Sequence, residues 1–188
     1  RLKGIRHYGN NDAALVEFME QYHQLEVIQN VISVLSLSKN LRKLSLNASD
    51  CSIPVLCEYL RNSNSIESLE LFSNFNEDVA AALLRGCPRL RTLKLDQCTL
   101  AAWFVTFLKS ATSLRKLVLK SSKTADWDRI IDALPNALNS FHLYWCALGD
   151  ITKMQIVSIL GLPRLIKLQW NVDDEYSDAE FELVANSF

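Results

Sequence analysis

The chain has 188 residues, of which 49% are hydrophobic and 22% are charged, and its formal net charge is -1. These values are ordinary for a folded protein, and the small net charge excludes a bulk attraction to nucleic acid or to an anionic membrane. No run reaches the roughly 18 consecutive apolar residues of a membrane span, and residues 1–4 do not begin a signal peptide. We therefore expect a folded chain without a membrane span.

Residues 1–40 show no single regular pattern. Residues 2–7 fit a degenerate strand, and apolar residues at steps of three and four over residues 14–22 and 28–35 indicate helices. An alternative interpretation places a strand over residues 15–18. We expect this region to form an irregular N-terminal repeat with an extra helix, continuous with the regular part that follows.

One apolar spacing recurs throughout residues 41–188. Residues 90–100 read L-x-x-L-x-L-x-x-C-x-L, and the leading apolar residue of this spacing recurs at intervals of 24 to 27 residues. Its positions are Leu41, Ile66, Leu90, Leu114, Leu138 and Leu165. Because side chains in a strand alternate between two faces, the apolar residues face an interior and the residues between them face outward. We expect six regular repeats, whose strands stack into one parallel sheet over a shared core.

Helices are predicted between successive strands. They cover residues 53–61, 77–86, 101–109, 126–134 and 150–160. Residues 77–86 show the pattern most fully, with acidic residues in the first turn, a run of helix formers and a glycine at the end. Residues 178–188 are also interpreted as helical. The convex side of the molecule is therefore expected to be α-helical.

A small residue recurs three positions after the last apolar residue of each strand, where the chain turns. These positions hold Ser49, Asn74, Cys98, Ser122, Cys146 and Asp173. Such side chains can satisfy backbone groups that the turn would otherwise bury without partners. We predict a structural role for Cys98 and Cys146, and no nucleophilic role. The cysteines number five, and buried reduced thiols suit an intracellular, cytoplasmic location better than a disulfide framework does.

On these residues the chain resembles leucine-rich repeat proteins, and its helical return segments are similar to those of the helix-backed, ribonuclease-inhibitor-like superfamily. This resemblance covers about residues 40–186. Residues 86–98, which begin Gly-Cys-Pro, look like the cysteine-containing repeats of F-box proteins. The resemblance implies an α/β leucine-rich repeat solenoid, a horseshoe with a parallel β-sheet on its concave face and α-helices on its convex face. It also implies that the fold binds protein partners without a cofactor.

Residues suited to catalysis or metal binding are scattered along the chain. The three histidines, His7, His23 and His142, fall in different repeats, and no glycine-rich phosphate loop occurs. The acidic residues 173–175 follow a predicted strand and are interpreted as a solvated loop rather than a metal site. We therefore expect no enzymatic activity, no metal site and no cofactor.

The outward-facing strand positions form the candidate binding surface on the concave face. The side chains selected as partner-binding are Phe72, Lys94, Lys116, Lys120, His142, Tyr144, Trp145 and Gln169. Aromatic side chains dominate many interfaces, which favours the aromatic members of this set. For Phe72 and Trp145, packing within the molecule is an equally weighted alternative.

A basic area extends over two adjacent repeats. It contains Lys94, Arg115, Lys116, Lys120 and Lys123. Contact with phosphate or with an acidic peptide is one interpretation, with an aromatic ring beside it for stacking. However, Glu70 and Asp96 are predicted on the same face, and scattered lysines keep a sheet surface soluble. We favour the solubilising role.

We expect a protein–protein interaction module that presents a rigid concave surface, so that little ordering entropy is lost on binding. Three alternatives stay open at this point. They are the substrate-recognition part of an F-box-type ubiquitin ligase, a ligand-sensing or regulatory repeat domain of an immune receptor or pathogen effector, and an RNA-binding surface. The expected partner is a protein, and nucleic acid is not expected.

Overall fold

The computed structural model describes residues 5–6, 27–29, 41–47, 53–73, 75–124, 126–144, 146, 158–171 and 180–184. Within these residues, nine strands form one sheet in the order β1-β2-β3-β4-β5-β7-β9-β10-β11. They are β1 (Ile5–Arg6), β2 (Val27–Gln29), β3 (Lys43–Asn47), β4 (Ser68–Phe72), β5 (Thr92–Asp96), β7 (Lys116–Lys120), β9 (Ser140–Tyr144), β10 (Lys167–Asn171) and β11 (Glu180–Val184). All neighbouring strands are parallel except β10 and β11.

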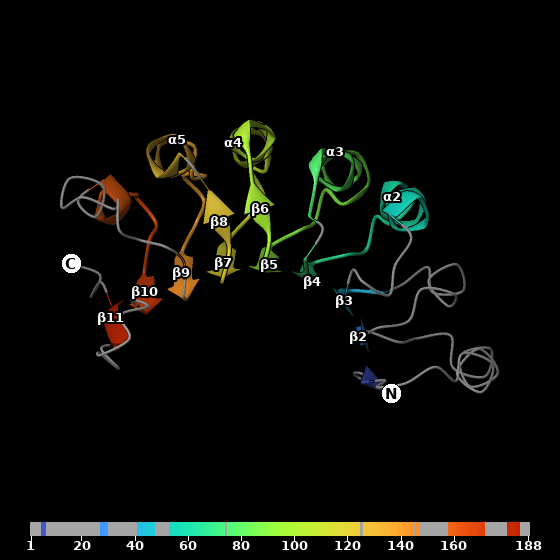
Figure 1. Ribbon diagram of the computed structural model, residues 1–188, viewed down its shortest axis with the longest axis horizontal. Helices are drawn as coiled ribbons and strands as arrows, with labels where there is room; N and C mark the ends of the chain where they lie inside the picture. Colours follow the sequence, from blue (N-terminus) through green and yellow to red (C-terminus); the bar gives the residue numbers. More distant parts are fainter. Residues whose placement is uncertain are drawn as a thin grey trace.

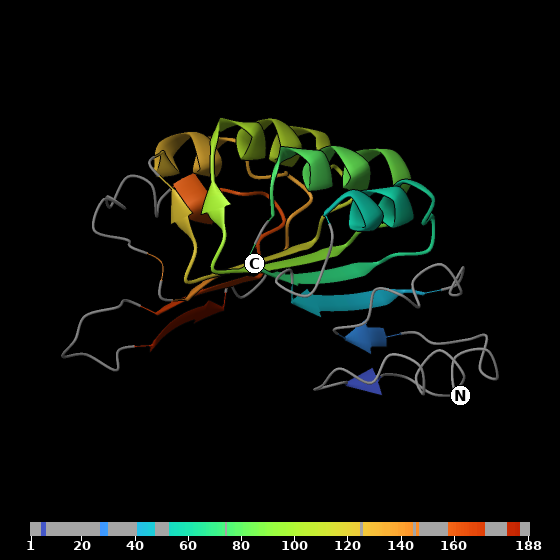
Figure 2. The ribbon, with the colours of Figure 1, turned by 45° about the vertical axis from the view of Figure 1, so that its right-hand side comes forward.

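The helices form a second layer over this sheet. They are α2 (Ile53–Arg61), α3 (Glu77–Gly86), α4 (Ala102–Ser110) and α5 (Trp127–Asp132). The sheet follows an arc, and the helices lie on its outer, convex side (Figure 1). In the turned view the helix layer lies over the sheet layer (Figure 2). None of the helices in the described ranges is long and apolar enough to cross a membrane.

The six strands predicted from the apolar spacing are confirmed. Each of β3, β4, β5, β7, β9 and β10 begins two residues after a leading apolar residue. The second apolar residues of the repeats are aligned across the sheet and are at most 2% exposed: Leu44, Leu69, Leu93, Leu117, Phe141 and Leu168. Because burying a leucine side chain contributes about 1.5–3 kcal/mol, this apolar row is a main source of stability.

Backbone hydrogen bonds join each repeat to the next. The carbonyl oxygen of Arg42, just before β3, accepts from Glu67 N at 2.8 Å and from Ser68 N at 2.9 Å. At each of the four following steps, from β4 to β10, the carbonyl oxygen just before one strand again accepts two N–H groups of the next repeat. A repeat therefore satisfies its neighbour's backbone groups as well as its own.

The helix bounds follow the prediction with small shifts. α2 and α3 have the predicted bounds, and α4 begins and ends one residue later than predicted. α5 begins one residue later than predicted because Asp126 is its N-cap, whose Oδ1 accepts from Arg129 N at 3.2 Å. Of residues 150–160, only 158–160 are described, and these are helical.

The prediction of helix was wrong in two segments that form strands. Val27–Gln29 overlaps the predicted helix 28–35 but pairs with β3 as β2, because β-branched side chains fit a strand and the edge of β3 offers hydrogen-bond partners. Glu180–Val184, predicted as helix, pairs antiparallel with β10 as β11. Its alternation of Glu, Phe, Glu and Leu is the period of a strand.

The prediction for the remaining N-terminal residues has a mixed outcome. β1 lies within the predicted strand over residues 2–7. The predicted helix over residues 14–22 and the alternative strand over 15–18 lie outside the described residues. The division of the chain at residue 40 stays a prediction.

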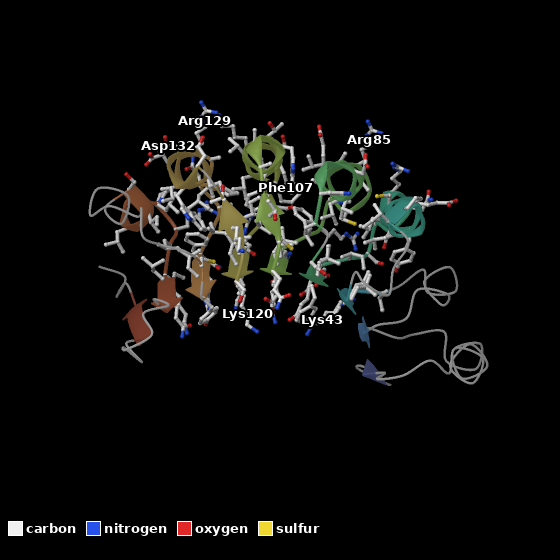
Figure 3. The ribbon with its side chains drawn as sticks, in the orientation of Figure 1. Lys43, Arg85, Phe107, Lys120, Arg129 and Asp132 are labelled. Atoms are coloured by element: carbon white, nitrogen blue, oxygen red, sulfur yellow. The ribbon has the colours of Figure 1, made fainter. Side chains whose placement is uncertain are left out.

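An aromatic cluster fills the space between sheet and helices near α3 and α4. The ring of Phe75 lies 5.2 Å from Trp103 and 5.6 Å from Phe107, measured between centroids. The rings of Phe104 and Phe107 are stacked 5.9 Å apart. Phe107 lies between the two layers (Figure 3). Such contacts contribute about 0.5–1.5 kcal/mol per pair beyond the area that they bury.

Small side chains in the turns pair with backbone groups, as predicted, and these groups belong to the preceding repeat. Ser122 is fully buried, and its Oγ lies 3.4 Å from the carbonyl oxygen of Leu95 and 3.3 Å from Cys98 N, which donates to it. One repeat further, Cys146 Sγ donates to the carbonyl oxygen of Leu119 at 3.5 Å. The predicted turn positions that lie outside the described residues are Ser49, Asn74 and Asp173.

A left-handed backbone occurs at three described residues that each come just before a predicted turn position. Ser73, Gln97 and Ser121 have φ values of 55°, 56° and 47°. This conformation costs about 1–2 kcal/mol for a residue with a side chain. Each N–H thereby donates to a carbonyl oxygen of the next strand, as Gln97 N does to Lys120 O at 2.9 Å.

Gly86 ends α3 where the backbones of α2 and α3 meet. A Cβ at this position would collide with the carbonyl oxygen of Leu60 and would lie 2.6 Å from Arg61 Cα. The next residue, Cys87, donates from Sγ to the same carbonyl oxygen at 3.5 Å. The glycine is thus required by the close approach of two helices.

We predict that Gly86→Ala lowers the free energy of unfolding by about 1–3 kcal/mol, because the backbone of α2 would have to move. Urea unfolding followed by circular dichroism measures this change. Ser110→Ala is the matched control, since Ser110 is exposed and ends α4 as Gly86 ends α3. Equal stability of the two variants would contradict the close approach.

We predict that Ser122→Ala costs about 1–3 kcal/mol in the same measurement, because the buried N–H of Cys98 loses its acceptor. Ser122→Cys should recover part of the loss, since a thiol occupies the equivalent turn position at Cys146. A Ser122→Ala protein as stable as the wild type would show that this turn contact contributes nothing.

Candidate binding surface on the concave face

Three rows of residues cross the inner face of the sheet, because every second side chain of a strand points to the same face. The first row is Lys43, Ser68, Thr92, Lys116, Ser140 and Lys167. The second row is Ser45, Glu70, Lys94, Val118, His142 and Gln169. The third row is Phe72, Asp96, Lys120 and Tyr144. Lys43 and Lys120 project away from the helices (Figure 3).

Ion pairs neutralise two of the predicted basic residues. In the second row, Lys94 Nζ lies 3.3 Å from Glu70 Oε2 on the adjacent strand. In the third row, Lys120 Nζ lies 3.1 Å from Asp96 Oδ2. Both lysine side chains are more than 40% exposed, so each pair contributes no more than about 1 kcal/mol to stability. Their main effect is to fix the side chains and to cancel charge.

Asp96 is buried, although it forms an ion pair with the partly exposed Lys120. The residue is 8% exposed, and its Oδ1 atom has no hydrogen-bond partner among the described residues. The carboxylate therefore has one oxygen paired with Lys120 and one oxygen without a donor. This arrangement keeps a negative charge beside the half-buried ring of Phe72, the neighbour of Asp96 in the third row.

Three side chains of β9 form a hydrogen-bonded chain along the strand. Ser140 Oγ lies 2.7 Å from His142 Nε2, and Tyr144 Oη lies 3.1 Å from His142 Nδ1. A neutral imidazole donates from one nitrogen only, so one hydroxyl group donates to the ring and the other accepts from it. The contacts fix the orientation of all three side chains.

The predicted contact residues differ in how much of each side chain is accessible. Phe72, Lys116 and Tyr144 are half-buried, and Lys94 and Lys120 are exposed at their charged ends. His142 is 5% exposed and Gln169 is 9% exposed, so these two buried residues support the surface more than they form it. Trp145 lies outside the described residues. Binding by the set as a whole stays a prediction.

A hollow of about 410 Å³ lies at the edge of the inner face where β3, β4, β5 and β7 begin. We call it the edge hollow; its charged lining residues are Lys43, Glu67, Glu70, Arg91, Lys94 and Lys116. Glu67 and Arg91 are not among the predicted contact residues, although Arg115, at the same position before β7, belongs to the predicted basic area. The position itself recurs at intervals of 24 to 27 residues and would have marked this edge.

The ammonium group of Lys116 is unfavourably placed in the edge hollow. Burial lowers its pKa from the usual 10.5, and the nearby charges of Lys94 and Lys167 lower it further. Among the described residues, no carboxylate lies within ion-pair distance of Lys116. The folded chain therefore holds this ammonium group at an energetic cost.

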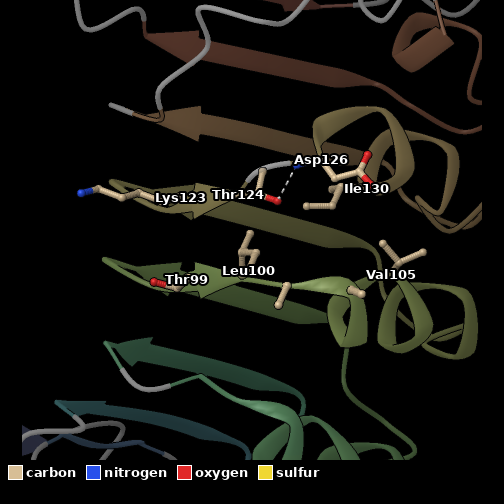
Figure 4. A pocket seen from close by; sticks show the side chains of 9 residues that line it. Thr99, Leu100, Val105, Lys123, Thr124, Asp126 and Ile130 are labelled. Carbon is tan, nitrogen blue, oxygen red and sulfur yellow. Dashed lines mark hydrogen bonds between the residues drawn. The ribbon is translucent and has the colours of Figure 1, made fainter.

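A second hollow, of about 430 Å³, lies between the small sheet of β6 (Thr99–Leu100) and β8 (Lys123–Thr124) and the starts of α4 and α5. Its walls are mainly apolar, with Leu100, Val105 and Ile130 around it (Figure 4). Lys123 points away from it, and Asp126 N donates to Thr124 Oγ1 at 3.2 Å (Figure 4). Lys123 lies in this small sheet, whereas Lys94, Lys116 and Lys120 lie on β5 and β7 of the large sheet.

The cysteines of the described residues are free, buried thiols: Cys57, Cys87, Cys98 and Cys146. Burial raises the pKa of Cys87 to about 12 and that of Cys146 to about 11. Because the thiolate is the reactive form, these groups are poor nucleophiles at neutral pH. Within the described ranges, no group of three or more His, Cys, Asp and Glu side chains is placed to hold a metal ion.

We predict that Lys116→Gln is more stable than the wild type near neutral pH and that this gain disappears as the pH rises. The folded-state pKa of Lys116 lies below its unfolded value of 10.5, so the unfolded wild type binds more protons between the two values. Wild-type stability therefore rises through that window relative to the variant. Urea unfolding of both proteins at about pH 7 and about pH 11 tests this prediction.

The control is Lys109→Gln, which removes one positive charge from the exposed side of α4. It reports the effect of changing the net charge alone. If both variants change stability equally at each pH, the prediction for Lys116 is wrong.

Comparisons with known proteins give a match among solved structures. No protein-family model matches the chain, and no curated protein sequence matches it. Among solved structures, human 5T4, also called Wnt-activated inhibitory factor 1 or trophoblast glycoprotein, matches with a TM-score of 0.51 and 20% sequence identity. The match covers 80% of this chain and 56% of that chain, so the chain spans little more than half the length of this neighbour. At this identity the match shows the fold alone, which is that of a leucine-rich repeat protein.

Proposed function

We propose that the chain is a protein-recognition module that binds its partner on the concave face. The observation that carries this proposal is the fixed arrangement of side chains in the second and third rows. The pairs Lys94–Glu70 and Lys120–Asp96 hold long side chains in place before a partner arrives. The hydrogen bonds among Ser140, His142 and Tyr144 hold the Tyr144 side chain in place in the same way. Less side-chain entropy is then lost on binding.

We further propose a helix-backed horseshoe of the ribonuclease-inhibitor-like type. The regular alternation of strands with α2, α3, α4 and α5 supports this proposal. An intracellular, cytoplasmic location stays part of it, supported by the free state of the buried thiols. The Gly-Cys-Pro sequence at residues 86–88 is explained by packing against Leu60, so it does not by itself favour an F-box protein.

We propose no enzymatic role for the Ser140–His142 pair. A histidine that acts as a general base becomes a cation, and here it would do so on the strand beside β7, which carries Lys116 and Lys120. The ring is also 5% exposed, which leaves little room for a substrate. No cofactor is part of the proposal. The ion pairs of Lys94 and Lys120 also oppose an RNA-binding role, because they remove two phosphate contacts.

Affinity capture of partners from a cell lysate, quantified by mass spectrometry, tests the proposed function. We predict that Tyr144→Ala weakens capture of specific partners about 10-fold or more, as expected for an aromatic anchor at an interface. Leu84→Ala is the matched control, because Leu84 is an exposed apolar residue on the outer helix α3. Thermal unfolding of both variants verifies that each is folded.

Partners lost with Tyr144→Ala and retained with Leu84→Ala would support recognition by the concave face. The reverse pattern would move the binding site to the helices and overturn the proposal. Retention of every partner by both variants would also contradict it.

A further inference from the structure

We propose that the edge hollow binds an acidic segment of a protein partner, held in an extended conformation with two carboxylates about four residues apart. This proposal rests on the proposed function and names the chemistry of the partner. It concerns the first row and the residues just before the strands, where the chain does not neutralise its own charge.

Positive charge is in excess in the edge hollow. Its lining contains the cations Lys43, Arg91, Lys94 and Lys116 against the carboxylates Glu67 and Glu70. The ion pair between Lys94 and Glu70 removes one charge of each sign. Three cations then face the single carboxylate of Glu67, so the hollow attracts an anion.

The structure shows no carboxylate paired with these remaining cations among the residues that it describes. In the part of the molecule that the structure describes, Lys43, Arg91 and Lys116 form no ion pair. This contrasts with Lys94 and Lys120, which each have a carboxylate on the adjacent strand. The unpaired charge is thus confined to the edge of the inner face.

Hydroxyl groups complete the lining. Ser45, Ser68 and Thr92 line the same hollow, and in the described ranges their hydroxyl groups form no hydrogen bond with another residue. Each hydroxyl group can donate to a carboxylate oxygen. A carboxylate that is removed from water must be paired with a cation and must accept hydrogen bonds. The lysines, the arginine and the hydroxyl groups of the hollow can together meet both needs.

The unfavourable environment of the Lys116 ammonium group also supports binding of an anion. Its ammonium group is partly buried beside the charges of Lys94 and Lys167. A carboxylate placed between these groups would relieve the repulsion that the folded chain otherwise retains. A partly buried cation in such an unfavourable setting is the kind of arrangement that proteins keep at binding sites.

The strand spacing sets the length of the bound segment. Lys43 on β3 and Lys116 on β7 lie three strand intervals apart in the first row, which is about 14 Å at about 4.8 Å per interval. An extended chain that crosses the strands advances about 3.3 Å per residue, so about four residues span this distance. Two glutamates at positions i and i+4 would therefore reach both lysines, with Arg91 between them.

A peptide fits this surface better than a nucleic acid does. A nucleic acid needs many phosphate contacts in succession, and affinity falls when few cations are available. Here Glu67 lies in the hollow, and Glu70 and Asp96 occupy the next two rows. These carboxylates repel a long polyanion but leave room for a short segment with spaced charges.

Fluorescence anisotropy with synthetic peptides tests the proposal. The probe is a labelled peptide of glycine and serine with two glutamates four positions apart. We expect binding that weakens with added salt, about 5-fold weaker binding by Lys116→Gln, and a similar loss with Lys43→Gln. Glu70→Gln should strengthen binding about 2-fold to 5-fold, because it releases Lys94 and removes a repelling charge.

Three controls separate a specific site from general attraction. The same peptide with glutamines, and one with adjacent glutamates, should bind more weakly than the probe. Lys109→Gln, on the convex side, should bind the probe as the wild type does. A single-stranded RNA of about 12 nucleotides should bind more weakly than the probe.

The proposal fails if the probe binds with a Kd above about 1 mM, or if Lys109→Gln weakens binding as much as Lys116→Gln does. It also fails if the RNA binds more tightly than the probe and loses affinity with Lys116→Gln, which would assign the hollow to nucleic acid. Lys116→Gln is expected to be folded and more stable, so its lost binding would not reflect misfolding. If probe binding fails while Tyr144→Ala still loses partners, only the acidic character of the partner is overturned.

Discussion

The structure depends on the hydrogen bonds that each repeat makes with the next. The carbonyl oxygen before one strand accepts two N–H groups from the following repeat, and the turn serine or cysteine contacts the carbonyl oxygen of the preceding strand. A repeat taken alone would leave these backbone groups without partners and its leucines uncovered by the neighbouring repeats. Stability is therefore a property of neighbouring pairs, and local damage in one repeat weakens the two beside it.

The same constraint explains how the surface is built. Because the register is fixed, residues at equal positions in adjacent repeats lie next to one another, about 4.8 Å apart. Opposite charges 24 residues apart, such as Glu70 and Lys94, become ion pairs. Where the repeats place a hydroxyl group beside a lysine, as at Thr92 and Lys116, the charge is left to solvent or to a partner. The inner face thus combines a neutralised, ordered region with a cationic edge.

Sequence reasoning predicted the strands of the regular repeats because leucine spacing reports a buried row directly. It missed β2 and β11, where pairing with an edge strand decides the conformation and the local pattern is short. The left-handed residues Ser73, Gln97 and Ser121 carry no glycine signal, so the shape of the turn could not be predicted. Among the candidate contacts, the concave positions could be derived from alternation. The burial of His142 could not, because it depends on which neighbours its ring meets.

Gly86 lies in the outer helix layer of the molecule but influences the shape of the inner face. The distance between neighbouring strands is fixed by their hydrogen bonds, whereas the distance between neighbouring helices depends on the side chains between them. The ratio of the helix distance to the strand distance sets the curvature of the arc. A glycine that lets α2 approach α3 flattens the arc at that point. The edge hollow is lined by residues of β3 and β4, the strands that precede α2 and α3, and by residues of β5 and β7. The absence of one methyl group on the convex side therefore helps to determine how widely the inner face opens.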